Sequence, residues 1–135
     1  MIARRIIDEV WNRGEIRNVT DLIAKEFVMH RRGQRITGGP DLVAGSIMMT
    51  RASFPDLVAS IDTLIAEDDC VAMYLTITGT HTGDPFYGIQ PSGREIRIAQ
   101  TGILRFESGK AAESWMVLDE LALMEQLGAR MPRPR

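Results

Sequence analysis

Cysteine is almost missing from this sequence, since Cys70 is the single one among 135 residues. One cysteine cannot form an intrachain disulfide, and it cannot build a zinc site from thiolates. Long apolar runs are missing as well, because none approaches the ~20 residues of a membrane-spanning helix. The opening segment 1–12 carries arginines but has neither a compact apolar stretch nor a small-residue cleavage site. We therefore read no signal peptide and expect a cytoplasmic protein without membrane contact.

An excess of one charge sign is also missing. The net charge is −2 with both signs interspersed, which offers no basic surface for phosphates and predicts no nucleic-acid partner. The segment 130–135 is locally basic, but its two prolines and its terminal position favour a frayed tail. His30 and His81 do not stand at a helical metal-ligand spacing, so we expect no metal site.

The remaining pattern is that of one globular domain over residues 1–129, because 44% of the residues are apolar and 25% are charged. Apolar residues recur at helical spacing in 2–13, around 19–23 and from Pro40 to about Ser53, and a short strand is expected over 27–35. After Pro55 the apolar residues alternate, which predicts strands over 57–66, 70–81, 95–106 and 111–118. An amphipathic helix follows Asp119. Helices followed by an antiparallel meander with one apolar face predict an α+β fold in which helices cover one side of the sheet.

Polar residues that fall on the core-facing positions of these strands are the candidates for a site. Such side chains must find hydrogen bonds or line a cavity. They are His81 on the second strand of the meander, Gln100 with Gly102 on the third, and Ser114 on the fourth. His30 joins them from the 27–35 strand, and apolar walls are expected from Trp11, Met48, Met73 and Met116.

Each of these residues also has a purely structural interpretation. His81 is either a loop anchor or a catalytic group, and Gln100 either satisfies a backbone group or faces a ligand. Asp119 precedes a helix, so it is either an N-cap or an acid–base group. The methionines and tryptophans are either core residues or ligand walls. With no standard nucleophile motif present, the chemistry left open is general acid–base catalysis by a carboxylate, a histidine and an amide.

Several short stretches together resemble the SnoaL-like polyketide (ester) cyclases of the NTF2-like superfamily, over nearly the whole chain. They are 10–14 (VWNRG), 54–56 (FPD), 79–83 (GTHTG), 91–94 (PSGR), 105–106 (RF), 109–110 (GK), 115–119 (WMVLD) and 126–128 (QLG). The resemblance implies a cone-shaped α+β barrel, with N-terminal helices on a curved antiparallel sheet around a deep pocket. It also implies no cofactor and a homodimer or higher assembly. Well-studied members close a ring of a polyketide by aldol condensation, with an Asp as acid–base.

The resemblance is weakest at the residues that carry this chemistry. The cyclases have a Gln-x-His pair where this chain has Gln100 and Gly102, and their catalytic Asp falls on Met116. Asp119 matches a second Asp of the same run.

The first hypothesis is a cofactor-independent enzyme acting on a small apolar carbonyl or polyketide-like substrate. Asp119 would be its acid–base group, His30 and His81 would assist, and Gln100 would orient a carbonyl. The alternative is a non-catalytic binding protein, because Met116 and Gly102 replace the working residues. A third possibility is an assembly protein that uses the outer sheet face. All three hypotheses expect a dimer through that face, whose apolar residues are Tyr74, Ile103, Trp115 and Val117.

Overall fold

The computed structural model describes residues 1–130, in which helices pack against one face of a six-stranded sheet. The helical elements are α1 (Ile2–Arg5), the π-helix η1 (Ile6–Asn12), the 3-10 turn η2 (Ile16–Asn18), α2 (Val19–Leu22), α3 (Pro40–Ser53) and α4 (Glu120–Gln126). The strands are β1 (Ile23–Arg31), β2 (Gln34–Thr37), β3 (Val58–Glu67), β4 (Cys70–Thr80), β5 (Glu95–Glu107) and β6 (Lys110–Leu118). Apart from Arg130, the predicted tail lies outside the described residues. No helix within residues 1–130 is long and apolar enough to cross a membrane.

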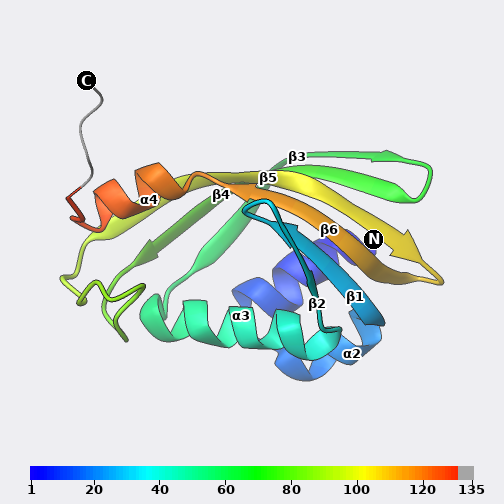
Figure 1. Ribbon diagram of the computed structural model, residues 1–135, viewed down its shortest axis with the longest axis horizontal. Coiled ribbons are helices and arrows are strands. Elements are labelled where there is room, and N and C mark those ends of the chain that lie inside the picture. The colour runs from blue at the N-terminus through cyan, green and yellow to red at the C-terminus, as the bar shows by residue number, and fades with distance from the viewer. Residues whose placement is uncertain (131–135) are drawn as a thin grey trace.

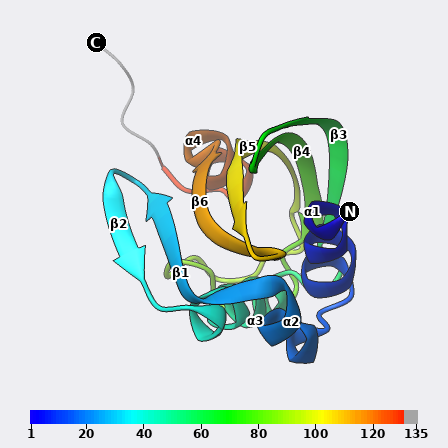
Figure 2. The ribbon, with the colours of Figure 1, turned by 90° about the vertical axis from the view of Figure 1, so that its right-hand side faces the viewer.

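The strands lie in the order β2-β1-β6-β5-β4-β3. Neighbours are antiparallel except β1 and β6, which run parallel. Seen from its end, the sheet curves from β2 to β3 over the helices (Figure 2), with α3 and α2 beneath it (Figure 1). The predicted α+β fold is confirmed. The meander from β3 to β6 is antiparallel as expected, while the parallel β1–β6 pair is a feature that alternation alone does not reveal.

Helix α3 covers the concave face of the sheet with an apolar stripe, and its two ends are marked in the sequence. Pro40 occupies the first turn, where its missing N–H costs nothing. Gly39 precedes it with a φ of 70°, and a Cβ there would stand 2.2 Å from the Lys25 carbonyl oxygen. Val43 and Ile47, four residues apart, are buried. At the other end Phe54 leaves the helical conformation and Pro55 follows it, so the helix ends at Ser53, as the sequence predicts.

Two strand assignments differ from the sequence-based expectation. The predicted strand over 27–35 is two strands, because Arg32 and Gly33 form a turn with positive φ between β1 and β2. In β3 a bulge between Ile61 and Thr63 shifts the alternation. Uninterrupted alternation from Ala59 and Ile61 predicts that Ile65 points inward. Because of the bulge, Leu64 packs against the core instead and Ile65 is 63% exposed.

The buried side chains form two clusters. The larger one joins the N-terminal helices and α3 to β1, β3 and β4. The smaller one lies under α4, where Phe54 and Phe86 pack with Ile96, Ile98 and Leu123. Residues of both clusters line one cavity, so the interior is hollow between them.

Candidate functional site

A cavity of about 420 Å³ lies between the concave face of the sheet and the helices. Its walls are mostly apolar and come from every strand except β2, from η1, from α3 and from the start of α4. Trp11, Met73 and Met116 are three of the predicted wall residues that line it. A space of this size suits a small organic molecule, since ligand pockets begin at about 300 Å³ and are mainly apolar with a few polar groups.

Two polar side chains on the sheet face into the cavity as predicted, Gln100 from β5 and Ser114 from β6. Ser114 is 3% exposed. Within residues 1–130 neither side chain forms a hydrogen bond that would satisfy it internally. By contrast, the hydroxyls of Ser46 and Thr50 on α3 donate to carbonyls of their own helix. Gln100 and Ser114 are therefore neutral groups available to a ligand.

The exposed part of the lining marks the mouth of the cavity. There Arg32, from the β1–β2 turn, donates to the Glu120 carboxylate at the start of α4 and to the Tyr87 hydroxyl at 2.8 Å. The Arg32 guanidinium also lies over the Tyr87 ring, 5.1 Å from its centroid. Hydrogen bonds from Arg32 to Glu120 and then to Tyr87 raise the pKa of Arg32 above its usual value. Three separate elements are thus linked by one cation at the entrance.

Asp119 does not line the cavity. It is the N-cap of α4, and its carboxylate accepts a hydrogen bond from the Ala122 N–H at 3.2 Å. Its own N–H donates to the Ala99 carbonyl, which fixes the residue against β5. Of the two interpretations of Asp119, an N-cap or an acid–base group, its contacts match the N-cap. The neighbouring Glu120 lines the cavity instead.

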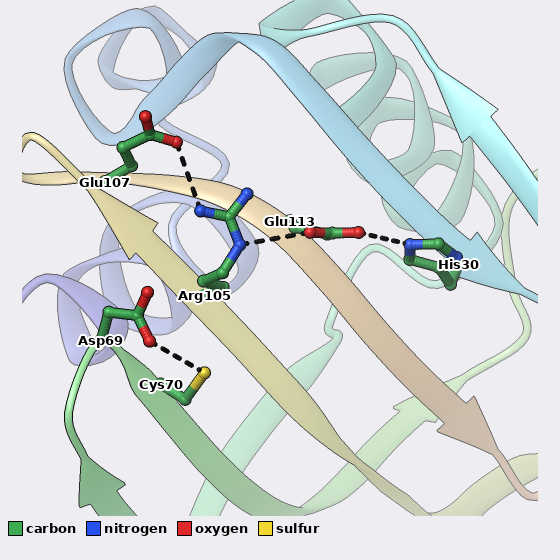
Figure 3. A network of polar contacts seen from close by, with 6 residues as sticks. All are labelled: His30, Asp69, Cys70, Arg105, Glu107 and Glu113. Atoms are coloured by element: carbon green, nitrogen blue, oxygen red, sulfur yellow. Dashed lines mark hydrogen bonds and ion pairs between the residues drawn. The ribbon is translucent and has the colours of Figure 1, made fainter.

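His30 lies on the outer face of the sheet, because it has the opposite parity to Phe27, Met29 and Arg31, which line the cavity. Its Nε2 is 2.6 Å from the Glu113 carboxylate, and its ring stacks on Trp115 with centroids 5.1 Å apart. Figure 3 shows Glu113 bridging His30 and Arg105. The contacts with His30 first, and Arg105 next, hold the pKa of Glu113 below its usual range. His30 is therefore separated from the cavity by the sheet.

His81 is fully buried, but it anchors a loop and does not line the cavity. Its Nε2 is 2.9 Å from the Asp84 carbonyl oxygen, and its ring packs against Phe54. Nδ1 has no hydrogen-bond partner among the described residues. The loop that His81 holds carries Phe86 and Tyr87 to the cavity wall, so His81 supports the wall without lining the cavity.

Two further predicted pocket residues lie elsewhere. Met48 is 56% exposed on α3, and its neighbour Met49 lines the cavity in its place. Gly102 is paired with Met116 across β5 and β6, and a Cβ on Gly102 would stand 2.4 Å from the Met116 sulfur. The Met116 side chain thus occupies the space in front of Gly102.

Among the polar residues at the cavity that sequence reasoning missed are Arg31, Arg32, Tyr87 and Glu120. Arg31 was recognisable, since it shares its strand face with Phe27 and Met29. The other three depend on how the β1–β2 turn, the β4–β5 loop and α4 come together, and no local pattern indicates that. Within residues 1–130 no cluster of three or more His, Cys, Asp or Glu side chains has a metal-binding arrangement.

A curved sheet closed by helices around one mainly apolar cavity defines an α+β ligand-pocket protein of the NTF2-like type. A sequence model of the SnoaL-like polyketide cyclases matches residues 1–127, so the chain belongs to this family. No curated protein sequence matches the chain significantly.

Solved structures agree with this assignment. AclR from Streptomyces galilaeus is 27% identical with a TM-score of 0.85, over 99% of this chain and 83% of AclR. TsrD from Streptomyces laurentii is 25% identical with a TM-score of 0.85, over 96% and 93% of the two chains. A SnoaL-like polyketide cyclase from Agrobacterium tumefaciens has a TM-score of 0.77 over 94% and 95% of the chains, and at 21% identity it supports the fold alone.

Proposed function

We propose that the chain is a cofactor-independent enzyme that acts by acid–base chemistry on a small apolar carbonyl or polyketide-like molecule. The observation that carries the proposal is the Gln100 amide, which faces a mainly apolar cavity and has no side-chain hydrogen bond to any of residues 1–130. An amide N–H placed in such a cavity can donate to a carbonyl oxygen and stabilise the negative charge of an enolate. Membership of the SnoaL-like family supports the same class of ligand.

Glu120 is the group that we assign to proton transfer, in place of Asp119. Among residues 1–130, it is the one carboxylate that lines the cavity. Arg32 holds it at the mouth, where it faces the space that a ligand would fill. A carboxylate fixed in this way can remove a proton from the carbon next to a carbonyl, while Gln100 holds the oxygen. His30 and His81 take no direct part in this scheme, because they do not line the cavity.

Deuterium exchange into 2-tetralone tests this proposal without knowledge of the natural substrate. This bicyclic ketone is mainly apolar, like the walls of the cavity, and has exchangeable protons beside its carbonyl. We expect the protein to accelerate exchange in D₂O, followed by NMR, and Glu120→Gln to lower the rate by about 100-fold. Asp119→Asn is the matched control, since Asn also caps helices, and it should exchange like the wild type. Equal rates for wild type and Glu120→Gln would remove Glu120 from the mechanism.

A non-catalytic ligand-binding protein is the second candidate. Gly102 and Met116 favour it, because these residues stand where the resemblance places a histidine and the catalytic aspartate of the cyclases, and neither transfers protons. This candidate predicts saturable binding of 2-tetralone with no acceleration of exchange. Catalysed exchange that depends on the cavity would exclude it.

The proposal includes a homodimer formed through the outer face of β4, β5 and β6. The register places Tyr74 and Val117 on either side of Thr101, and Ile103 beside Trp115. These four apolar side chains are 38 to 68% exposed. Such a patch is typical of protein interfaces. We expect a dimer by light scattering and a shift toward monomer for Ile103→Asp, since Ile103 is exposed and does not line the cavity; a monomeric wild type at micromolar concentration would contradict the assignment.

A cytoplasmic location and a reaction without cofactor complete the proposal. The single cysteine, Cys70, is a free thiol, as suits a reducing compartment. Fractionation of cells that produce the chain would test the location, and activity that survives exhaustive dialysis against a chelator would test the chemistry.

A further inference from the structure

One cation at the cavity, Arg31, has no counter-charge among the described residues 1–130. Arg31 is the last residue of β1, lines the cavity and is only partly exposed. Within residues 1–130 no carboxylate lies within ion-pair distance of its guanidinium. The neighbouring Arg32 is different, because Glu120 compensates its charge. The cavity lining therefore carries one unpaired positive charge.

The position of Arg31 on the wall is defined by strand pairing. In the parallel pair of β1 and β6, Met29 lies beside Ser114 and His30 beside Trp115. One step further in this register places Arg31 beside Met116, and Met29, Arg31, Ser114 and Met116 all line the cavity. Arg31 is thus on the same face as the neutral polar groups and not on the outer surface.

A partly buried guanidinium is stable without a partner only if water or a ligand solvates it. Its planar donors match the two oxygens of a carboxylate, and the pairing is stronger when part of the water is excluded. The remaining walls suit an apolar body. Two features of a favoured ligand follow, an apolar ring system for the cavity and an anionic group for Arg31.

We propose that the cavity selects carboxylic acids with an apolar ring system, and that Arg31 is the specificity residue that binds the carboxylate. This inference rests on the proposed function, since it concerns the same cavity. It adds a preference for a negative charge, so that an acid binds more tightly than a neutral carbonyl compound of the same shape. Arg31 acts in binding and transfers no proton.

A pair of probes of equal shape separates the preference for a negative charge from binding itself. 2-Naphthoate and 2-naphthamide differ in the charge of one group on the same rings. Binding is followed by NMR of ¹³C-methyl-labelled methionines, because Met29, Met73 and Met116 line the cavity while Met48 is exposed outside it. We expect both probes to shift the cavity methionines and the acid to bind about tenfold more tightly than the amide.

Variants assign the preference to Arg31. Arg31→Gln should abolish the preference, so that acid and amide bind with about equal affinity, and it should leave the affinity for the amide unchanged. Arg35→Gln is the matched control, since Arg35 lies on β2, is exposed and does not line the cavity. It should keep the full preference. If Arg31→Gln does not fold, the same comparison is made with Arg31→Met, which removes the charge and keeps a long side chain; it should likewise lose the preference for the acid.

The outcomes distinguish this inference from the function on which it rests. Equal affinities for acid and amide, with both shifting the cavity methionines, would overturn the role of Arg31 and leave the proposed binding function intact. A preference that persists in Arg31→Gln would also overturn it. No shift of Met29, Met73 or Met116 with either probe would overturn both.

Discussion

Replacing Gly102 by alanine should destabilise the protein through a backbone clash at the β5–β6 pair. A Cβ on Gly102 would stand 2.2 Å from the Trp115 carbonyl oxygen and 2.8 Å from the Met116 Cα. Cβ atoms in folded proteins essentially never come closer than 3.0 Å to such atoms, so the two strands would have to move apart. Overpacking that forces backbone shifts costs typically 1–3 kcal/mol, and we expect Gly102→Ala to lose about 3 kcal/mol of its free energy of unfolding.

Gly45→Ala is the matched control for this substitution. Gly45 lies in the middle of α3, is exposed, and has no atom within 4 Å of the added Cβ. Alanine there should raise the free energy of unfolding by about 1 kcal/mol, because glycine is a poor helix former. With an m-value of about 1.5 kcal/mol/M, urea unfolding should show a midpoint about 2 M lower for Gly102→Ala and slightly higher for Gly45→Ala.

A double variant separates the backbone clash from the contact with the Met116 side chain. Met116→Ala removes the sulfur that would lie 2.4 Å from the new Cβ, but it leaves the Trp115 carbonyl in place. We therefore expect Gly102→Ala to be almost as costly in the Met116→Ala background as in the wild type. Full rescue by Met116→Ala, or an unchanged midpoint for Gly102→Ala alone, would refute the reasoning. The same clash also explains why a histidine side chain does not fit at this position.

Two other substitutions test the polar contacts described above. Asp119→Ala should cost about 1 kcal/mol of stability while Asp119→Asn costs little, since Ala removes the acceptor for the Ala122 N–H and Asn keeps one; equal thermal unfolding of the two variants would argue against the cap. For Glu113, the contacts with His30 and Arg105 hold the folded-state pKa below its usual value of 4.5. A depressed carboxyl pKa contributes stability above the unfolded pKa, and this contribution is lost as the pH falls through the folded pKa. Glu113→Gln should thus be less stable than the wild type at neutral pH, with the difference disappearing well below pH 4.5; a difference independent of pH would contradict the linkage.

The sequence predicts the regular elements well where the local pattern and the tertiary structure agree. Pro40 and Phe54-Pro55 bracket α3 in the sequence and in the structure. Alternation also places Gln100, Ser114 and Met116 on the inner face, since it depends on strand geometry alone. The same parity places His30 on the outer face, opposite Phe27 and Met29, so the pattern of its own strand already argued against a place in the cavity.

The remaining features depend on contacts between segments that are distant in the sequence. The bulge in β3 turns Leu64 toward the core and Ile65 toward the outside, and nothing in the apolar pattern of that strand indicates an extra residue. Asp119 and Glu120 are adjacent acidic residues, and the capping geometry of α4 decides which of the two faces the cavity. Arg32 and Tyr87 are 55 residues apart, and both stand in turns with positive φ that bring them to one mouth.

Titration of the ¹³C-methyl-labelled protein with 2-tetralone tests most directly whether this cavity is a site for small carbonyl compounds. We predict that Met73 and Met116 shift saturably while Met48 does not, and that Gln100→Leu weakens binding about tenfold because the carbonyl loses its donor. If Met73 and Met116 do not move, or if Gln100→Leu binds as tightly as the wild type, the cavity is not used in the way proposed.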